Sequence, residues 1–398
     1  MRVTTTAAAA LAVSMVFPVV LQPQSPPPRS NPSLDSVITK HMADAAIMGV
    51  GAAIIVNRQV VWMKGYGFAD QARTRPFTPS TIMNVGSVAK PITVVAMMRA
   101  VQEGRLSLDA DISTYLPFKV VNPHRPDALI TLRQLATHTS SITDRWEVYR
   151  DAYHYGGDSP ERLDRFLADY FAPNGRRYSR ENFLDAAPGT RREYSNIGAA
   201  LAGYIVERAY GEPLNVLTRR LIFTPLGMAS TGWFLSEVDR AKHSTLFVSQ
   251  NGQTIPIPLY GLTTYPDGGV RTSVADLSKF FMAMLNGGTY QNTRILDARM
   301  AAEMVRFQFS DANRPENFPA ADGNSGLFWR TKLNGTRVGH GGNDPGLQVE
   351  MLANLSGDVG VIFLMNTSLA GPDQRTSWAI FQALWAWAES LRPAGAAH

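Results

Sequence analysis

The 398-residue sequence contains no cysteine. Disulfide bonds, thiol catalysis and cysteine-bound metals are therefore excluded, as is a lipid anchor on an N-terminal cysteine. The seven histidines show no H-E-x-x-H or similar spacing, so the sequence offers little support for a metal site. We expect neither a metal ion nor a cofactor.

The sequence also lacks a large excess of charge of either sign. Lysine and arginine total 38 against 33 aspartate and glutamate residues, a net charge of +5, and no basic run occurs. This pattern argues against a nucleic-acid partner. Hydrophobic residues make up 45% of the chain, which is enough for a large buried core in one domain or two.

Only one hydrophobic run is long enough to suggest a targeting segment. It covers residues 7–21, follows Arg2, and is succeeded by a polar, proline-rich spacer. The run is short for a membrane-spanning helix and is typical of an export signal. We therefore predict a signal and spacer over residues 1–32 and a periplasmic or secreted protein with no stable membrane span. No good A-x-A cleavage motif precedes the spacer, so an uncleaved anchor is the alternative.

Apolar periodicity and turn residues predict strands at both ends of the chain and helices between them. The expected strands are residues 50–56, 59–67, 327–333, 336–339, 347–355 and 359–365. The expected helices are residues 33–46, 197–210, 214–223, 274–285 and 374–390. Asn57-Arg58 and Asn334-Gly335 are the expected hairpin turns.

These elements predict an α/β (α+β) fold. One antiparallel sheet is built from both chain ends, with the terminal helices on one face and a mostly helical middle lobe on the other. We expect a single catalytic domain over residues 33–398. Its sheet lobe comprises residues 33–80 and 326–398, and its helical lobe comprises residues 81–325. Residues 144–182 lack a long apolar face, so they form either a lid or a surface insertion.

A serine and a lysine lie three residues apart in the stretch Gly86-Ser87-Val88-Ala89-Lys90. The apolar residues that follow predict a helix from about Ser87 to a stop at Gly104. Residues three apart on a helix are neighbours, about 5–6 Å between Cβ atoms, which places the Lys90 amine near the Ser87 hydroxyl. A serine nucleophile needs such a base, and a helix N-terminus favours an oxyanion. Alone, the pair also fits a helix cap and a solvated lysine.

Two further motifs follow along the chain. Tyr194-Ser195-Asn196 precedes a predicted helix, and His340-Gly341-Gly342 comes just after a predicted strand. Taken singly, the first fits an ordinary helix cap and the second fits a tight turn.

Together and in this order, the three motifs resemble the serine β-lactamase and penicillin-recognising superfamily, specifically its class C β-lactamase-related branch. The resemblance covers about residues 34–391 and includes the strings GRLSLDADISTYLP, LRQLATHTSSI and VGHGGNDPG. That branch includes class C β-lactamases, D-alanyl-D-alanine carboxypeptidases, D-aminopeptidases and esterases. No G-x-S-x-G elbow surrounds Ser87, which disfavours an α/β-hydrolase.

The resemblance implies catalytic roles for three residues. Ser87 would be the acyl-accepting nucleophile, Lys90 would help to deprotonate it, and Tyr194 would shuttle a proton. Asn196 would contact the acyl side chain of the substrate and hold Lys90. The backbone N–H groups of Ser87 and Asn343 would form the oxyanion hole.

The third motif departs from the branch. Class C β-lactamases have K-T-G on this strand, and here the triplet is His340-Gly341-Gly342. A histidine is mostly neutral near pH 7, so this substitution weakens the case for β-lactams or D-Ala-D-Ala termini as preferred substrates. His340 is expected to orient the substrate, together with Gly341 and Gly342. His138, in the ATHTSS loop, is expected to be structural.

The resemblance therefore implies a serine hydrolase that forms a covalent acyl-enzyme with an ester or amide. The expected partner is a small-molecule or peptide substrate, which includes cell-wall peptides, D-amino-acid peptides, carboxylic esters and, weakly, β-lactams. Two alternatives stay open: a penicillin- or peptide-binding sensor with negligible turnover, and an acyltransferase that uses the same site.

Overall fold

The computed structural model describes residues 30–250 and 253–392. Residues 1–29 of the expected export segment lie outside this range. In the part of the chain that is described, no helix is both long and apolar enough to cross a membrane.

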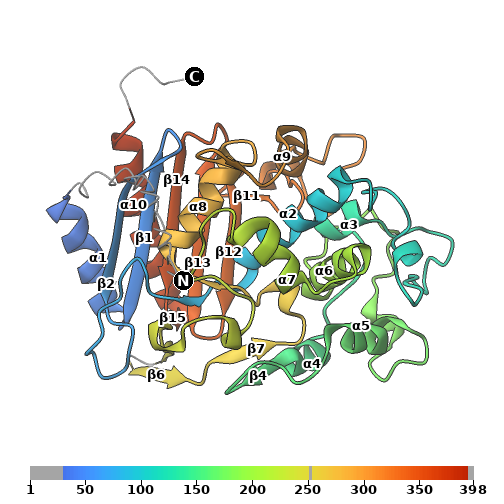
Figure 1. The fold of residues 1–398 in the computed structure, drawn as a ribbon, viewed down its shortest axis with the longest axis horizontal. Helices are drawn as coiled ribbons and strands as arrows, with labels where there is room; N and C mark the ends of the chain where they lie inside the picture. The colour runs from blue at the N-terminus through green and yellow to red at the C-terminus, as the bar shows by residue number, and fades with distance from the viewer. Residues whose placement is uncertain (1–29, 251–252, 393–398) are drawn as a thin grey trace, which may run out of the picture.

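A six-stranded antiparallel sheet forms the centre of the fold, in the order β11-β12-β13-β14-β1-β2 (Figure 1). Its strands are β1 (Gly49–Val56), β2 (Gln59–Gly67), β11 (Arg330–Lys332), β12 (Arg337–Asp344), β13 (Leu347–Asn354) and β14 (Val359–Met365). β1 pairs with β14, with Val50 opposite Met365 and Val56 opposite Val359. The prediction of one sheet built from both chain ends is confirmed.

The two terminal helices cover one face of this sheet. α1 (Pro32–Asp44) and α10 (Gln374–Ser390) lie side by side there. Their buried side chains, among them Ile38 and Phe381, pack with Phe363 of β14 in one apolar cluster. β14 is buried along its whole length because helices cover both of its faces.

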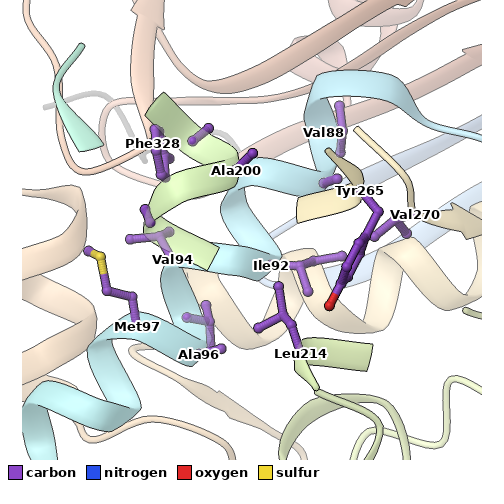
Figure 2. Close-up of a cluster of buried hydrophobic side chains, with 14 of the residues drawn as sticks. Val88, Ile92, Val94, Ala96, Met97, Ala200, Leu214, Tyr265, Val270 and Phe328 are labelled. Atoms are coloured by element: carbon purple, nitrogen blue, oxygen red, sulfur yellow. The ribbon is translucent and has the colours of Figure 1, made fainter. Parts of the chain in front are cut away.

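The opposite face carries the helical part of the chain. α8 (Val274–Leu285) packs on β1 and β14, and to its right in Figure 1 α2 (Ala89–Gln102) packs against α6 (Asn196–Tyr210). Figure 2 shows apolar side chains of α2, such as Ile92 and Met97, in the same cluster as Ala200 and Leu214. Nearly every residue of α2 is buried, so this helix is a rigid support for the side chains at its N-terminus.

The described chain also contains shorter elements. The helices are α3 (Leu132–Ala136), α4 (Trp146–Tyr149), α5 (Leu163–Phe171), α7 (Leu214–Thr218) and α9 (Ala298–Val305). The strands are β3 (Met83–Asn84), β4 (Tyr153–Tyr155), β5 (Leu246–Gln250), β6 (Gln253–Ile257), β7 (Tyr260–Leu262), β8 (Arg271–Thr272), β9 (Thr289–Tyr290), β10 (Thr293–Arg294) and β15 (Thr367–Leu369). Two single-turn helices border the site described below: η1 (Gly86–Val88) and η8 (Tyr265–Asp267).

Two sequence predictions in the C-terminal part were wrong. The triplet His340-Gly341-Gly342 lies inside β12 rather than after a strand, because all three residues pair with β13 in the ladder. The strand expected over residues 327–333 is reduced to β11, because Phe328 adopts a positive φ of 44° and its N–H donates to the carbonyl of Ala136.

The segment 144–182 divides between two environments. α5 packs into the core, where Phe166 and Leu167 are fully buried, so this part has a short apolar face that the sequence pattern did not reveal. α4 and β4 instead lie along the lower edge of the molecule in Figure 1, and their aromatic side chains line a cavity beside Asn196.

Candidate active site

Ser87 lies in η1, which leads directly into α2. The preceding residue, Gly86, has a φ of +52°, a conformation that favours glycine. The Ser87 Oγ accepts hydrogen bonds from Lys90 Nζ at 2.9 Å and from the Tyr194 hydroxyl at 2.9 Å. The structure therefore brings the three expected catalytic side chains into mutual contact.

Lys90 is fully buried, and its amine has three oxygen partners. Besides Ser87, Nζ donates to Asn196 Oδ1 at 2.7 Å and to the backbone carbonyl of Asp267 at 2.8 Å. No carboxylate of residues 30–250 or 253–392 forms an ion pair with it. These contacts hold the amine at a fixed position beside the Ser87 hydroxyl.

A half-buried carboxylate fixes the motif that contains Tyr194 and Asn196. Asp144 accepts hydrogen bonds from the Ser195 hydroxyl at 2.7 Å, the Asn196 N–H at 2.6 Å and the Ile197 N–H at 3.0 Å. Ser195 itself caps α6 through a hydrogen bond from the Gly198 N–H. The sequence did not predict Asp144 as a site residue, because no local sequence pattern relates it to a turn about fifty residues later.

Replacing Asp144 by asparagine should weaken both the fold and the site. An amide has one acceptor oxygen, so its NH₂ group must face a donor that the carboxylate now accepts. We expect a loss of about 1–3 kcal/mol in the free energy of unfolding and at least a tenfold lower kcat. Urea denaturation and steady-state kinetics would measure the two effects. Asp151→Asn, whose side chain is 61% exposed, is the matched control, and equal stability of the two variants would contradict the role of Asp144.

Two neutral histidines flank Tyr194. Burial, followed by the nearby charge of Arg330, holds the pKa of His340 well below its ordinary value. Its Nδ1 donates to the Gly341 carbonyl at 2.7 Å, so the ring carries its proton there. Burial likewise lowers the pKa of His138, whose ring lies 4.2 Å from that of Tyr194 and whose Nδ1 accepts from the Ser195 N–H. His138 thus supports the Tyr194 ring and the turn that carries it.

β12 lies directly against the Ser87 turn. A Cβ atom on Gly342 would come within 2.2 Å of the Val85 carbonyl oxygen and 3.2 Å of the Ser87 nitrogen, so only glycine allows this approach. Asn343, the next residue, lines a cavity of about 400 Å³ together with Asn196. Gly341 faces the other way, toward the Lys332–Glu350 ion pair.

Two more carboxylates adjoin the site, the buried Asp267 and the half-buried Asp344, and neither was expected from the sequence. Burial raises the pKa of Asp267 to about 7, and its Oδ1 accepts from the Tyr149 hydroxyl at 3.1 Å. Burial raises the pKa of Asp344 to about 6, and its Oδ1 accepts from the Tyr153 hydroxyl at 2.7 Å. No group of three or more His, Asp or Glu side chains suited to a metal ion occurs in the described part of the chain.

Comparison with known proteins agrees with this arrangement. The model of a family described as Beta-lactamase matches residues 34–384. Esterase EstB of Burkholderia gladioli is 31% identical over 210 residues, which are 52% of this chain and 52% of that protein. The chain spans about half the length of the curated relatives it matches first.

Solved structures resemble the fold over most of the chain. An octameric penicillin-binding protein homologue from Pyrococcus abyssi superposes with a TM-score of 0.70 at 26% identity, covering 90% of this chain and 77% of the other. A D-amino acid amidase from Ochrobactrum anthropi SV3 superposes with a TM-score of 0.66 at 20% identity, covering 89% and 99%. Because the family model matches residues 34–384 of this chain and the sheet is arranged as described, the chain belongs to the beta-lactamase family.

Proposed function

We propose that this protein is a serine hydrolase that cleaves an ester or amide through a covalent acyl-enzyme. The observation that carries the proposal is the double contact at Ser87 Oγ, with Lys90 Nζ and the Tyr194 hydroxyl each 2.9 Å away. A serine hydroxyl becomes a useful nucleophile only when a base removes its proton. Lys90 and Tyr194 both lie within reach of this oxygen, and either can accept the proton in its deprotonated form.

Acylation follows from this geometry. With either Lys90 or Tyr194 in its deprotonated form, Ser87 Oγ attacks the substrate carbonyl carbon while its proton passes to that group. The backbone N–H groups of Ser87 and Asn343 stabilise the oxyanion, and the close approach of Gly342 to the Ser87 turn supports this placement of β12. As the carbon–oxygen or carbon–nitrogen bond breaks, Tyr194 returns the proton to the leaving group.

Deacylation uses the same groups in reverse order. A water molecule attacks the acyl carbonyl, the Lys90–Tyr194 pair accepts its proton, and Ser87 regains its own. An alcohol or amine acceptor in place of water would give acyl transfer with the same residues. The esterase and amidase relatives support ester and amide substrates for this chemistry.

A cation suited to a substrate carboxylate comes from Arg330 rather than from His340. The Arg330 guanidinium lies 5.9 Å from the centre of the Tyr194 ring and borders a hollow of about 220 Å³ beside Gly342 and Asn343. It forms no ion pair within the described ranges, whereas the neighbouring Lys332 is paired with Glu350. This geometry suits a leaving group that carries a carboxylate, as at the end of a peptide.

Replacing Arg330 by glutamine should therefore reduce the preference for such leaving groups. We expect kcat/KM for a depsipeptide with a free carboxylate to fall about tenfold relative to its methyl ester, because one charge-assisted hydrogen bond is lost. Arg337→Gln, whose guanidinium packs on Trp385 far from Ser87, is the control. An unchanged ratio in Arg330→Gln would remove Arg330 from carboxylate recognition.

The proposed function is tested by intact mass spectrometry and chromogenic ester hydrolysis together. The protein is incubated with benzylpenicillin, any adduct is mapped, and p-nitrophenyl butyrate turnover is measured in parallel. Ester turnover supports the hydrolase. A stable adduct without turnover of any ester or amide would contradict the hydrolase and support a penicillin- or peptide-binding sensor instead.

A further inference from the structure

A second feature of the site is the cavity of about 400 Å³ that opens beside Asn196 and Asn343. Its wall contains three aromatic residues from α4 and β4: Trp146, Tyr149 and Tyr153. Asp344, the last residue of β12, also faces it. The cavity therefore combines aromatic surfaces with a carboxylate directly beside the proposed nucleophile.

The Asp344 carboxylate has no cationic partner. Its Oδ1 accepts from the Tyr153 hydroxyl at 2.7 Å, and no lysine, arginine or histidine of the described residues lies within ion-pair distance. The Lys90 charge acts on Asp344 only from beyond ion-pair distance, so this carboxylate at a substrate-sized cavity remains electrostatically suited to a cation from outside the chain.

The aromatic residues favour the same kind of ligand. The Trp146 side chain lines the cavity and is 64% exposed, which is unusual for a large aromatic residue. The rings of Tyr149 and Tyr153 meet edge to face at 5.8 Å, deeper along the same wall. Aromatic faces attract ammonium groups, most strongly where water is partly excluded.

We propose that this cavity selects substrates whose acyl group carries a positively charged, ammonium-type substituent, with Asp344 as the specificity-determining residue. The inference rests on the proposed function, because it assigns the cavity to the acyl side of the bond that Ser87 attacks. Two observations support that side: the cavity borders Asn196, which holds Lys90, and the Arg330 hollow, which shares Asn343 with the cavity, lies on the Gly341–Gly342 side of that residue. The two hollows then present opposite charges to the two halves of a substrate.

The test uses two p-nitrophenyl esters of the same shape. One carries a 4-(trimethylammonio)butanoyl group, and the other carries 5,5-dimethylhexanoyl, in which carbon replaces the charged nitrogen. We expect kcat/KM for the cationic ester to exceed that for the neutral ester by about tenfold. A wild-type preference for the neutral ester would overturn the proposal.

Asp344→Asn isolates the charge, because the amide oxygen still accepts from the Tyr153 hydroxyl. The ratio of the two kcat/KM values should fall to about three in this variant, because the aromatic wall still attracts the cation. Trp146→Ala, at an exposed position, should lower the ratio about threefold without a risk to folding. Asp151→Asn removes a carboxylate from the neighbouring exposed turn and should leave the wild-type ratio unchanged. An Asp344→Asn ratio equal to that of the wild type would remove Asp344 from substrate selection.

Calorimetric binding of both intact esters to Ser87→Ala separates this inference from the proposed function. Tighter binding of the cationic ester, lost in Ser87→Ala/Asp344→Asn, supports the cavity's selectivity even if the wild type hydrolyses neither ester. Equal binding of the two esters would overturn the selectivity even if Ser87 proves to be the nucleophile.

Discussion

Alanine at position 87 should abolish acyl-enzyme formation and lower ester turnover by about 10⁴-fold or more, the scale seen when a serine nucleophile is removed. The side chain that would form the covalent bond is absent, and the Lys90–Tyr194 pair then has only water to activate. Burst kinetics with p-nitrophenyl butyrate and intact mass after acylation would measure both losses.

The Ser87→Ala substitution should leave the fold around the site intact. In Ser87→Ala the Lys90 amine still has Asn196 Oδ1 and the Asp267 carbonyl as acceptors, so a change in thermal stability is expected to be small. Ser80→Ala, on the exposed loop before β3, serves as the control for loss of a hydroxyl. Turnover within tenfold of the wild type in Ser87→Ala would mean that another group is the nucleophile.

Phenylalanine at position 194 should reduce kcat by about 10²-fold or more, the contribution typical of a positioned acid–base group. The change removes the hydroxyl that lies 2.9 Å from Ser87 Oγ and keeps the ring that packs on His138 at 4.2 Å. The loss should therefore appear in kcat more than in KM. Pre-steady-state measurement of acylation and deacylation would show which step slows.

Tyr290→Phe, on β9, is the matched control because it removes a phenol hydroxyl far from the site. A rate for Tyr194→Phe equal to that of this control would assign the proton transfers to Lys90 alone. A fall in both kcat and thermal stability would instead indicate that the hydroxyl holds the site together.

Local patterns predicted the parts of the fold that local forces determine. The Asn57-Arg58 turn forms with both residues at positive φ, as a tight hairpin requires, and α10 spans the predicted residues. The Ser87–Lys90 contact follows from helical spacing in the same way. The β12 boundary was mistaken because two glycines have low strand propensity, and here pairing with β13 outweighs that preference.

The remaining parts of the site depend on contacts between distant segments. Lys90 donates to the backbone carbonyl of Asp267, and Asp144 accepts from three groups around α6. A backbone carbonyl leaves no trace in side-chain patterning, and a single aspartate in a polar loop resembles any solvated residue. Asp344 was not predicted as a site residue for the same reason, since the composition of residues 339–346 is typical of a turn.

The pairing of β1 with β14 also has a consequence for the order in which the chain folds. Their contacting residues are separated by roughly 300 positions, so the first hairpin emerges from the ribosome long before its neighbour in the sheet. Loop-closure entropy makes such late pairing slow, and the unpaired edge of β1 is meanwhile available to other strands. The Ser87 turn packs against β12, which, like β14, is synthesised near the end of the chain. Appearance of ester hydrolysis during refolding should therefore report completion of the sheet, and it should lag behind the helical signal.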